Sequence, residues 1–141
     1  MSDLTEFFGE PIAVYTTTDA IDDGVLVEAG LMAADLFRWP VLITRASWTD
    51  CVEWTEEDGL RTGVSQDQNG RLWDVLWMAS VAAKRAGATD QEQHFSLYRV
   101  SRNDVSGEDC EIVPELVTLK FQISLHDDGS PLVLISQPEE D

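Results

Sequence analysis

The chain has 141 residues, of which 43% are hydrophobic, and it carries a formal net charge of −18. This length is typical of one domain, and an apolar content that includes five Trp residues is enough for a packed core. These numbers exclude a disordered acidic polymer, and the charge argues against direct binding of DNA, RNA or anionic lipid. We therefore expect residues 1–141 to form a single acidic domain.

The sequence shows no targeting or membrane segment. No run of 18 or more apolar residues is present, and the first residues lack the basic and apolar regions of a signal peptide. Cys51 and Cys110 form no spaced motif, so a pair of reduced thiols is favoured over a disulfide. These features predict a cytoplasmic protein without a membrane partner.

The first elements of the chain are predicted to be short. Residues 12–15 are typical of a strand. A helix over 19–23 is expected to follow, with Thr17 or Thr18 as its N-cap and Gly24 at its end. Together these elements predict an N-terminal region that has no long helix of its own.

Short elements continue toward the middle of the chain. Residues 25–27 predict an extended segment, and 30–37 predict a weak helix that ends before Pro40, because proline restricts the residue before it. Residues 47–50 match a capping box, which predicts a helix over 48–54. One face of that helix is apolar at helical spacing and is expected to be buried.

The strongest predicted helix covers residues 71–86. It follows a polar, glycine-containing segment, 55–69, that predicts a loop, with Asn69 as the N-cap of the helix. One apolar stripe consists of Leu72, Val75, Leu76, Ala79, Ala83 and Ala86. Trp73 and Trp77 belong to a second stripe beside it. A helix that is apolar around most of its girth is a core helix, so we interpret both Trp rings as core rather than as a ligand cage.

The last third of the chain predicts β structure. Residues 94–100 are typical of a strand, and 117–125 alternate between apolar and polar side chains, as in a strand with one solvated face. Residues 127–130 predict a turn, and 132–136 predict the returning strand of a hairpin. The expected fold is α+β: a C-terminal three-stranded antiparallel sheet packed on the central apolar helix 71–86, with short N-terminal helices.

No constellation for catalysis, metal or cofactor binding is apparent. His94 and His126 belong to no nucleophile motif, and no phosphate-binding glycine motif occurs. Two separated Cys and two separated His residues do not match a zinc site. The segment 67–70 lacks the alternating carboxylates and the terminal Glu of a calcium loop. We therefore expect a protein that is not an enzyme and holds no cofactor or metal.

The acidic residues concentrate toward both ends of the sequence. Residues 1–30 hold seven acidic and no basic residues, residues 31–102 hold ten acidic and eight basic residues, and residues 103–141 hold ten acidic residues and Lys120 alone. Because chain ends often lie close together, these segments can form one negative face. The residues predicted to contact a partner are Asp19, Asp22, Asp23, Glu28, Glu108, Asp109, Glu111 and Glu115.

The density of carboxylates on such a face decides whether it can imitate the phosphates of DNA. Twenty-seven acidic residues spread evenly over about 7,000 Å² would give one per roughly 270 Å². B-DNA carries one phosphate per roughly 100 Å², so mimicry of DNA requires that the carboxylates cluster. The alternative is that the charge is a solvated coat or an adaptation to a salty host, which fifteen Asp against two Lys would also suit.

Several blocks of the sequence together resemble a known family. They are 8–12, 23–27, 39–41 with 44–45, 48–54, 70–78 and 116–120, of which 70–78 is the most specific. The chain resembles small uncharacterised acidic proteins of bacterial phages, plasmids and integrated mobile elements. The resemblance implies a mobile-element setting, in which similar small acidic proteins often act against restriction or CRISPR systems by occupying a nucleic-acid-binding site. It implies no catalytic residues.

These observations favour a binding protein over an enzyme. We expect an acidic inhibitor of the nucleic-acid-mimic type, which docks on a basic nucleic-acid-binding protein or complex of the host. The alternative is an accessory adaptor module of a mobile element, in which the charge serves solubility or salt adaptation.

Overall fold

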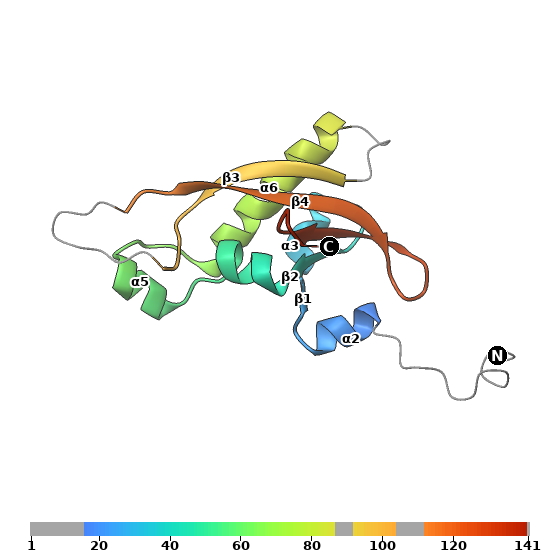
Figure 1. The fold of residues 1–141 in the computed structure, drawn as a ribbon, viewed down its shortest axis with the longest axis horizontal. Helices are drawn as coiled ribbons and strands as arrows, with labels where there is room; N and C mark the ends of the chain where they lie inside the picture. The colour runs from blue at the N-terminus through green and yellow to red at the C-terminus, as the bar shows by residue number, and fades with distance from the viewer. Residues whose placement is uncertain (1–15, 87–91, 104–111, 141) are drawn as a thin grey trace, which may run out of the picture.

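The structure is a computed structural model, and it describes residues 16–86, 92–103 and 112–140. A five-stranded mixed sheet with the strand order β1-β2-β5-β4-β3 lies against one long helix, α6 (Figure 1). The strands are β1 (Leu26–Glu28), β2 (Val41–Thr44), β3 (Glu92–Arg99), β4 (Glu115–Leu125) and β5 (Pro131–Ser136). The helices are α2 (Thr17–Asp22), α3 (Leu31–Ala34), α4 (Arg45–Ser47), the π-helix η1 (Trp48–Val52), α5 (Glu56–Thr62) and α6 (Gln68–Ala86).

The predicted α+β class is confirmed, and the sheet is larger than expected. Strands β3, β4 and β5 form the predicted antiparallel sheet and pack on α6. Strand β2 joins β5 in parallel, with Ile43 opposite Ile135, and β1 pairs antiparallel with β2 on its other side. The short N-terminal strands therefore complete the sheet instead of forming a separate layer.

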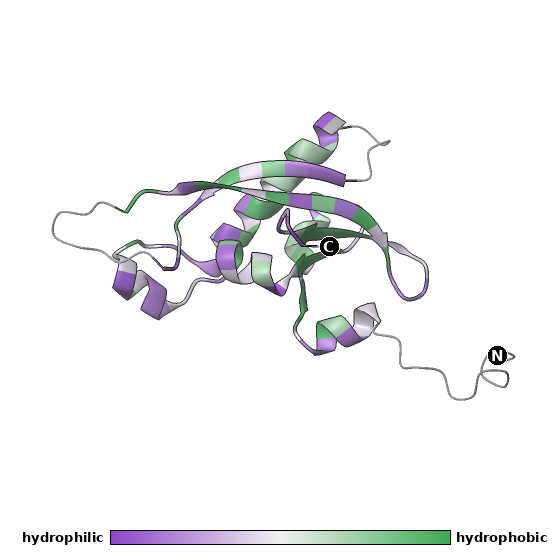
Figure 2. Cartoon of the chain, in the orientation of Figure 1, coloured by the Kyte–Doolittle hydropathy of each residue, from purple (hydrophilic) through white to green (hydrophobic). Residues whose placement is uncertain are grey.

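The core lies between α6 and the sheet. Leu72, Val75, Leu76 and Ala79 of α6 are buried at helical spacing against the inward side chains of the strands. Ile43 of β2 and Ile135 of β5, the central strand, are fully buried. Figure 2 shows hydrophobic residues along the central strands and hydrophilic ones over most of α5. The described part of the chain contains no helix that is both long enough and apolar enough to cross a membrane.

The prediction that both Trp side chains of α6 are core residues is wrong. Trp73 and Trp77 are 37% and 45% exposed. Each follows a buried residue by one position, which turns it about 100° around the helix and out of the core. The two rings stack on one another, with centroids 6.1 Å apart and an interplanar angle of 23°.

The segment 55–69 is not a loop throughout, because α5 occupies its first half. Thr55 caps this helix: its hydroxyl accepts from the Asp58 N–H at 3.1 Å, and the Asp58 carboxylate accepts from the Thr55 N–H at 2.8 Å. Gly63, with φ of 75°, ends the helix in the left-handed region. Such a capping box satisfies donors at the helix start, which explains a helix that has little apolar surface.

Three of the predicted helix N-caps are wrong. Thr16 caps α2 in a capping box with Asp19, in place of Thr17 or Thr18. Thr44, not Ser47, caps the next helix, which begins at Arg45 and widens into η1, where the Glu53 N–H donates to the Trp48 carbonyl at 2.8 Å. At the start of α6 the Asp67 carboxylate, not Asn69, accepts from the Gly70 N–H at 2.6 Å. The predicted strand 12–15, Gly87 and Cys110 lie outside the described residues.

Candidate functional site

The β4–β5 turn and α2 meet through one carboxylate. Asp127 accepts hydrogen bonds from the Thr17 N–H at 2.8 Å, the Thr18 N–H at 3.1 Å and the Thr18 hydroxyl at 2.7 Å. These contacts join segments that are 109 residues apart in the sequence. Figure 1 shows the turn beside α2 at one end of the molecule.

The contact gathers carboxylates at what we call the acidic end, defined as Asp19, Asp22, Asp23, Asp127 and Asp128; all five are exposed. Hydrogen bonds from the hydroxyl of Thr18 and the backbone of Thr17 lower the pKa of Asp127 below its usual range. The hydroxyl and N–H of Ser130 lower the pKa of Asp128 in the same way. Both carboxylates are therefore ionised at neutral pH.

The residues predicted to bind a partner are only partly brought together. Asp19, Asp22 and Asp23 lie together on and after α2. Glu28 is exposed at the end of β1, and Glu115 begins β4, where it lies 3.7 Å from Arg99. Glu108, Asp109 and Glu111 lie outside the described residues. The turn at 127–128 was missed as a site; its two adjacent Asp residues were the available signal.

The basic side chains are distributed differently from the acidic ones. Five of the nine are at least half-buried and contact internal partners: Arg61, Arg71, Arg99, Arg102 and Lys120. Lys120, for example, lies 3.3 Å from Glu92 and donates to the Glu140 carbonyl. The other four basic side chains, Arg38, Arg45, Lys84 and Arg85, are exposed.

Arg71 is the most deeply placed of these cations, with 4% of its surface exposed. Its guanidinium donates to the carbonyls of Val52 at 3.1 Å, Val100 at 2.9 Å and Asp50 at 3.1 Å. It also lies over the Trp54 ring, 4.7 Å from the centroid, in cation–π geometry. Burial lowers the pKa of Arg71, yet three carbonyls are bound by its charged form. This side chain joins η1, α6 and the end of β3.

Asp58 is the buried counterpart of these arginines. Burial alone would raise the pKa of its carboxyl, but hydrogen bonds from the Thr55 N–H and from the guanidinium groups of Arg61 and Arg102 outweigh it and hold the pKa well below its usual range. Arg102 Nε donates to Asp58 at 2.8 Å, and its other end pairs with Glu53. We call Asp58, Arg61, Arg102 and Glu53 the arginine network.

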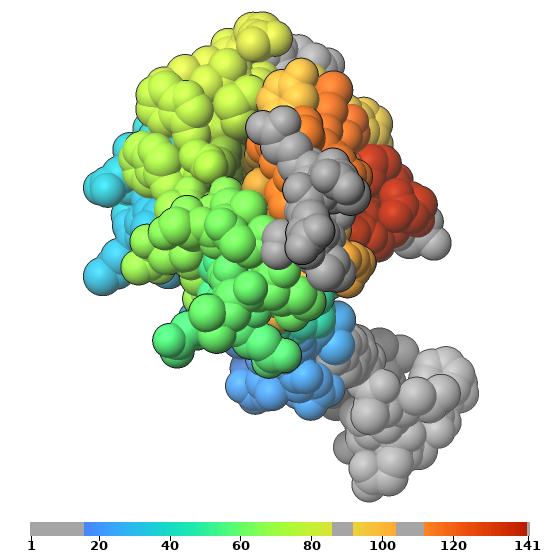
Figure 3. Space-filling view, turned by 90° about the vertical axis from the view of Figure 1, so that its left-hand side faces the viewer, coloured from blue at the N-terminus to red at the C-terminus, as the bar shows by residue number. Residues whose placement is uncertain are grey.

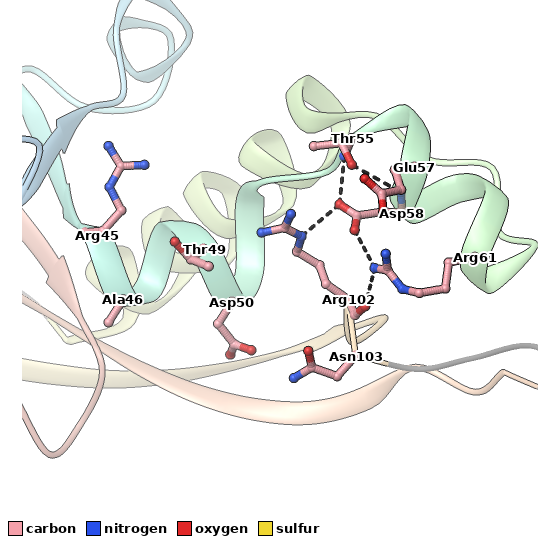
Figure 4. A pocket seen from close by; sticks show the side chains of 10 residues that line it. All are labelled: Arg45, Ala46, Thr49, Asp50, Thr55, Glu57, Asp58, Arg61, Arg102 and Asn103. Carbon is pink, nitrogen blue, oxygen red and sulfur yellow. Dashed lines mark hydrogen bonds and ion pairs between the residues drawn. The ribbon is translucent and has the colours of Figure 1, made fainter.

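An open cleft of about 870 Å³ lies over this network (Figure 4). Its lining is polar and consists of Arg45, Ala46, Thr49, Asp50, Thr55, Glu57, Asp58, Arg61, Arg102 and Asn103. Figure 4 shows Asp58 between Thr55, Arg61 and Arg102, so the cations nearest the cleft floor are already paired. The network is suited to holding α5 on the body of the protein rather than to binding a free anion.

The described residues that line the cleft include no His, Cys or Ser side chain. Cys51 is close by, but burial, followed by the neighbouring Asp50 carboxylate, raises the pKa of its thiol to about 12, which keeps it protonated at neutral pH. Among residues 16–86, 92–103 and 112–140, no group of three or more His, Cys, Asp or Glu side chains is placed to hold a metal ion. That the protein has neither enzyme activity nor a cofactor stays a prediction.

Comparison with protein-family models, with curated proteins and with solved structures gave no match. The resemblance to acidic proteins of mobile elements therefore stays a prediction.

Proposed function

We propose that this protein is a non-enzymatic cytoplasmic binding protein, and that its acidic end docks on a basic nucleic-acid-binding protein of a host defence system. The observation that carries the proposal is the meeting of α2 with the β4–β5 turn, which gathers five exposed carboxylates from segments 109 residues apart. A cluster of this kind is the condition that mimicry of DNA requires, because evenly spread charge is too dilute.

The fixed positions of the carboxylates support this proposal. Asp127 is held by three hydrogen bonds from α2, and Asp128 accepts from the Ser130 N–H at 2.9 Å. Asp19 accepts from the Thr16 N–H at 3.1 Å. Groups that are already ordered lose little conformational entropy on binding, and a rigid array of negative charge resembles a phosphate backbone more closely than mobile side chains do.

The internal contacts of the arginines also support the proposal that the acidic end binds a basic partner. A basic groove attracts a partner through the long-range field, which adds over all exposed charges. The arginines of the arginine network bind Asp58 and Glu53, and Arg71 binds backbone carbonyls, so these three arginines are engaged away from the acidic end. Association with a basic partner is then expected to be fast at low salt and to slow as salt rises.

The test is inhibition of nucleic-acid cleavage by a panel of purified restriction endonucleases and guide-RNA nucleases. We expect the protein to inhibit at least one of them, and the double variant Asp22→Asn/Asp23→Asn to inhibit about tenfold less well. The matched control, Glu56→Gln/Glu57→Gln, removes the same charge from α5 and is expected to inhibit like the unmodified protein. Equal loss in both variants would show that the acidic end has no special role.

A further inference from the structure

A second surface, separate from the acidic end, is aromatic. Trp73 and Trp77 stack on the outer side of α6. Tyr98 of β3 and Leu116 of β4 are opposite one another in the sheet and are 67% and 59% exposed. Isolated apolar side chains are common on surfaces, but contiguous ones that include two Trp mark sites of interaction. Figure 3 shows α6 next to the exposed ends of β3 and β4.

Three adjoining hollows run along this side of α6, and we call them together the α6 groove. The first, of about 350 Å³, lies around Trp73 and shares Asp74 with the second. The second, of about 270 Å³, is lined mainly by apolar atoms: Trp77, Met78, Leu97, Tyr98 and Leu116 line it together with Asp74 and Ser96. The third, of about 340 Å³, shares Met78 and Ser96 with the second and ends at Arg85 and His94.

The groove runs along an open sheet edge. Strand β3 is the last strand of the sheet, and no other strand in the described part of the chain pairs with its outer side. An unpaired edge presents backbone donors and acceptors to which an extended segment of another protein adds as a further strand. Alternate side chains of such a strand would point into the groove.

Charge at one end of the groove selects the type of side chain that fits there. Asp67 and Asp74 line the hollow around Trp73, and within the described residues neither is paired with a basic side chain. Arg71 also lines this hollow, but its guanidinium is bound to three carbonyls inside the fold. A cationic side chain placed here would contact both a carboxylate and an aromatic face, a combination that suits arginine.

We propose that the α6 groove binds an extended segment of a partner protein, which adds as a strand to the edge of β3. An arginine of that segment lies against Trp73 and Asp74, and an apolar side chain fills the hollow between Trp77, Tyr98 and Leu116. A second copy of this chain is the less suitable occupant, because two copies with a charge of −18 each repel one another. The proposal does not depend on the function of the acidic end.

The probe is a fluorescein-labelled peptide of the sequence Gly-Arg-Val-Arg-Leu-Arg-Val-Thr-Gly, measured by anisotropy. We expect Trp77→Ala and Tyr98→Thr each to weaken binding by about tenfold or more, as central aromatic contacts do. Trp39→Ala is the matched control, since Trp39 is an exposed Trp that lines none of the three hollows. If Trp77→Ala does not fold, as judged by circular dichroism, Tyr98→Thr alone decides.

Three further measurements test the arginine contact, the strand pairing and the occupant. Asp74→Asn should weaken binding more than its control Asp35→Asn, and methylating alternate backbone nitrogens of the peptide on the paired side should abolish binding. The acidic-end variant Asp22→Asn/Asp23→Asn should bind like the unmodified protein; an equal loss there would mean that the peptide is attracted only by charge. Unchanged affinity in Trp77→Ala and Tyr98→Thr, or a dimer in sedimentation that Tyr98→Thr dissociates, overturns the proposal.

Discussion

The α5 end and the α2 end of the molecule are both rich in carboxylates but use them differently. At the α5 end, the carboxylates of Asp58 and Glu53 are paired with arginines and hold a helix to the body of the fold. At the α2 end, Asp127 and Asp128 accept hydrogen bonds from backbone N–H groups and hydroxyls, and among the described residues neither forms an ion pair with Lys or Arg. The same type of side chain therefore contributes stability at one end and an external field at the other.

The two ends differ in whether a carboxylate is held by an arginine or by uncharged donors. Hydrogen bonds to hydroxyl and N–H groups fix a carboxylate in position and keep it ionised, whereas a guanidinium also cancels its charge. With only nine basic residues, a fold that uses five of them inside leaves few for the surface. The acidic end is thus a result of how the arginines are used as well as of how the acidic residues are distributed.

The largest expected effect is at Arg71, whose guanidinium joins η1, α6 and the end of β3. Arg71→Met keeps the aliphatic part of the side chain but leaves the carbonyls of Val52, Val100 and Asp50 without their donor, so it should reduce the free energy of unfolding by about 3 kcal/mol or more. Arg85→Met, on the exposed part of the same helix, should change it by less than about 0.5 kcal/mol. Urea denaturation measures both, and similar values for the two variants would show that the contacts of Arg71 do not stabilise the fold.

The next largest effect on the free energy of unfolding is expected at Asp58, and this effect should depend on pH. Asp58→Asn should lower the free energy of unfolding by about 2 kcal/mol at pH 7, less than for a fully buried pair because both arginines are partly exposed. The matched control is Glu57→Gln, an exposed neighbour whose change should stay within about 0.5 kcal/mol.

The pH dependence of that difference has a defined sign. The pKa of Asp58 is lower in the folded protein than in the unfolded chain, where it is about 3.9. The stability that its ionised form contributes is therefore complete above about pH 5 and is lost as the pH falls through about 4 and toward the folded pKa. The difference between the unmodified protein and Asp58→Asn should shrink along this range in urea denaturation. A difference that stays constant from pH 7 to pH 3 would contradict the role given to this carboxylate.

A smaller effect is expected on α6, which carries Arg71 inward and two Trp side chains outward. Trp77→Ala should cost about 1–2 kcal/mol, because 45% of the residue is already exposed, in contrast to about 3–5 kcal/mol for a fully buried Trp. Leu76→Ala, one position earlier and fully buried, is the internal reference and should cost more than Trp77→Ala. If thermal or urea denaturation shows that Trp77→Ala loses more stability than Leu76→Ala, Trp77 is a core residue after all.

The smallest effect on stability is expected at the acidic end. Asp22→Asn/Asp23→Asn should leave the free energy of unfolding within about 0.5 kcal/mol of the unmodified value, with any change toward greater stability, because like charges repel one another there. Such a gain should disappear in 1 M salt, where the screening length is about 3 Å. Loss of several kcal/mol would mean that these carboxylates stabilise the fold as Asp58 does.

The pattern of apolar residues in the sequence was sufficient to predict an element that is long and buries one face. The alternation in β4 and the apolar spacing of α6 predicted both elements and their packing. The parallel pairing of β2 with β5 was not predictable, because it joins residues about ninety positions apart and leaves no local signature. Helix α5 was missed because it buries only Asp58 and Thr62, which gives no apolar period.

The candidate site was less predictable than the fold. Sequence located Asp19, Asp22 and Asp23, but their neighbours on the surface come from the 127–128 turn, which only the tertiary contact through Asp127 reveals. The sequence does not show whether a polar side chain of a helix faces water or buried carbonyl groups. The inward position of Arg71 could therefore not be predicted. The two Trp side chains carried a similar ambiguity, since an apolar stripe suits a core and a docking surface equally.

The central claim is that the acidic end occupies a surface that normally binds nucleic acid. It is tested most directly by titrating duplex DNA or guide RNA into a preformed complex of this protein with a nuclease that it inhibits, with release followed by anisotropy of the labelled protein. The account predicts that nucleic acid displaces the protein, and that it displaces Asp22→Asn/Asp23→Asn at lower concentration than Glu56→Gln/Glu57→Gln. A ternary complex in which nucleic acid and this protein are bound together, with no change in either affinity, would contradict it.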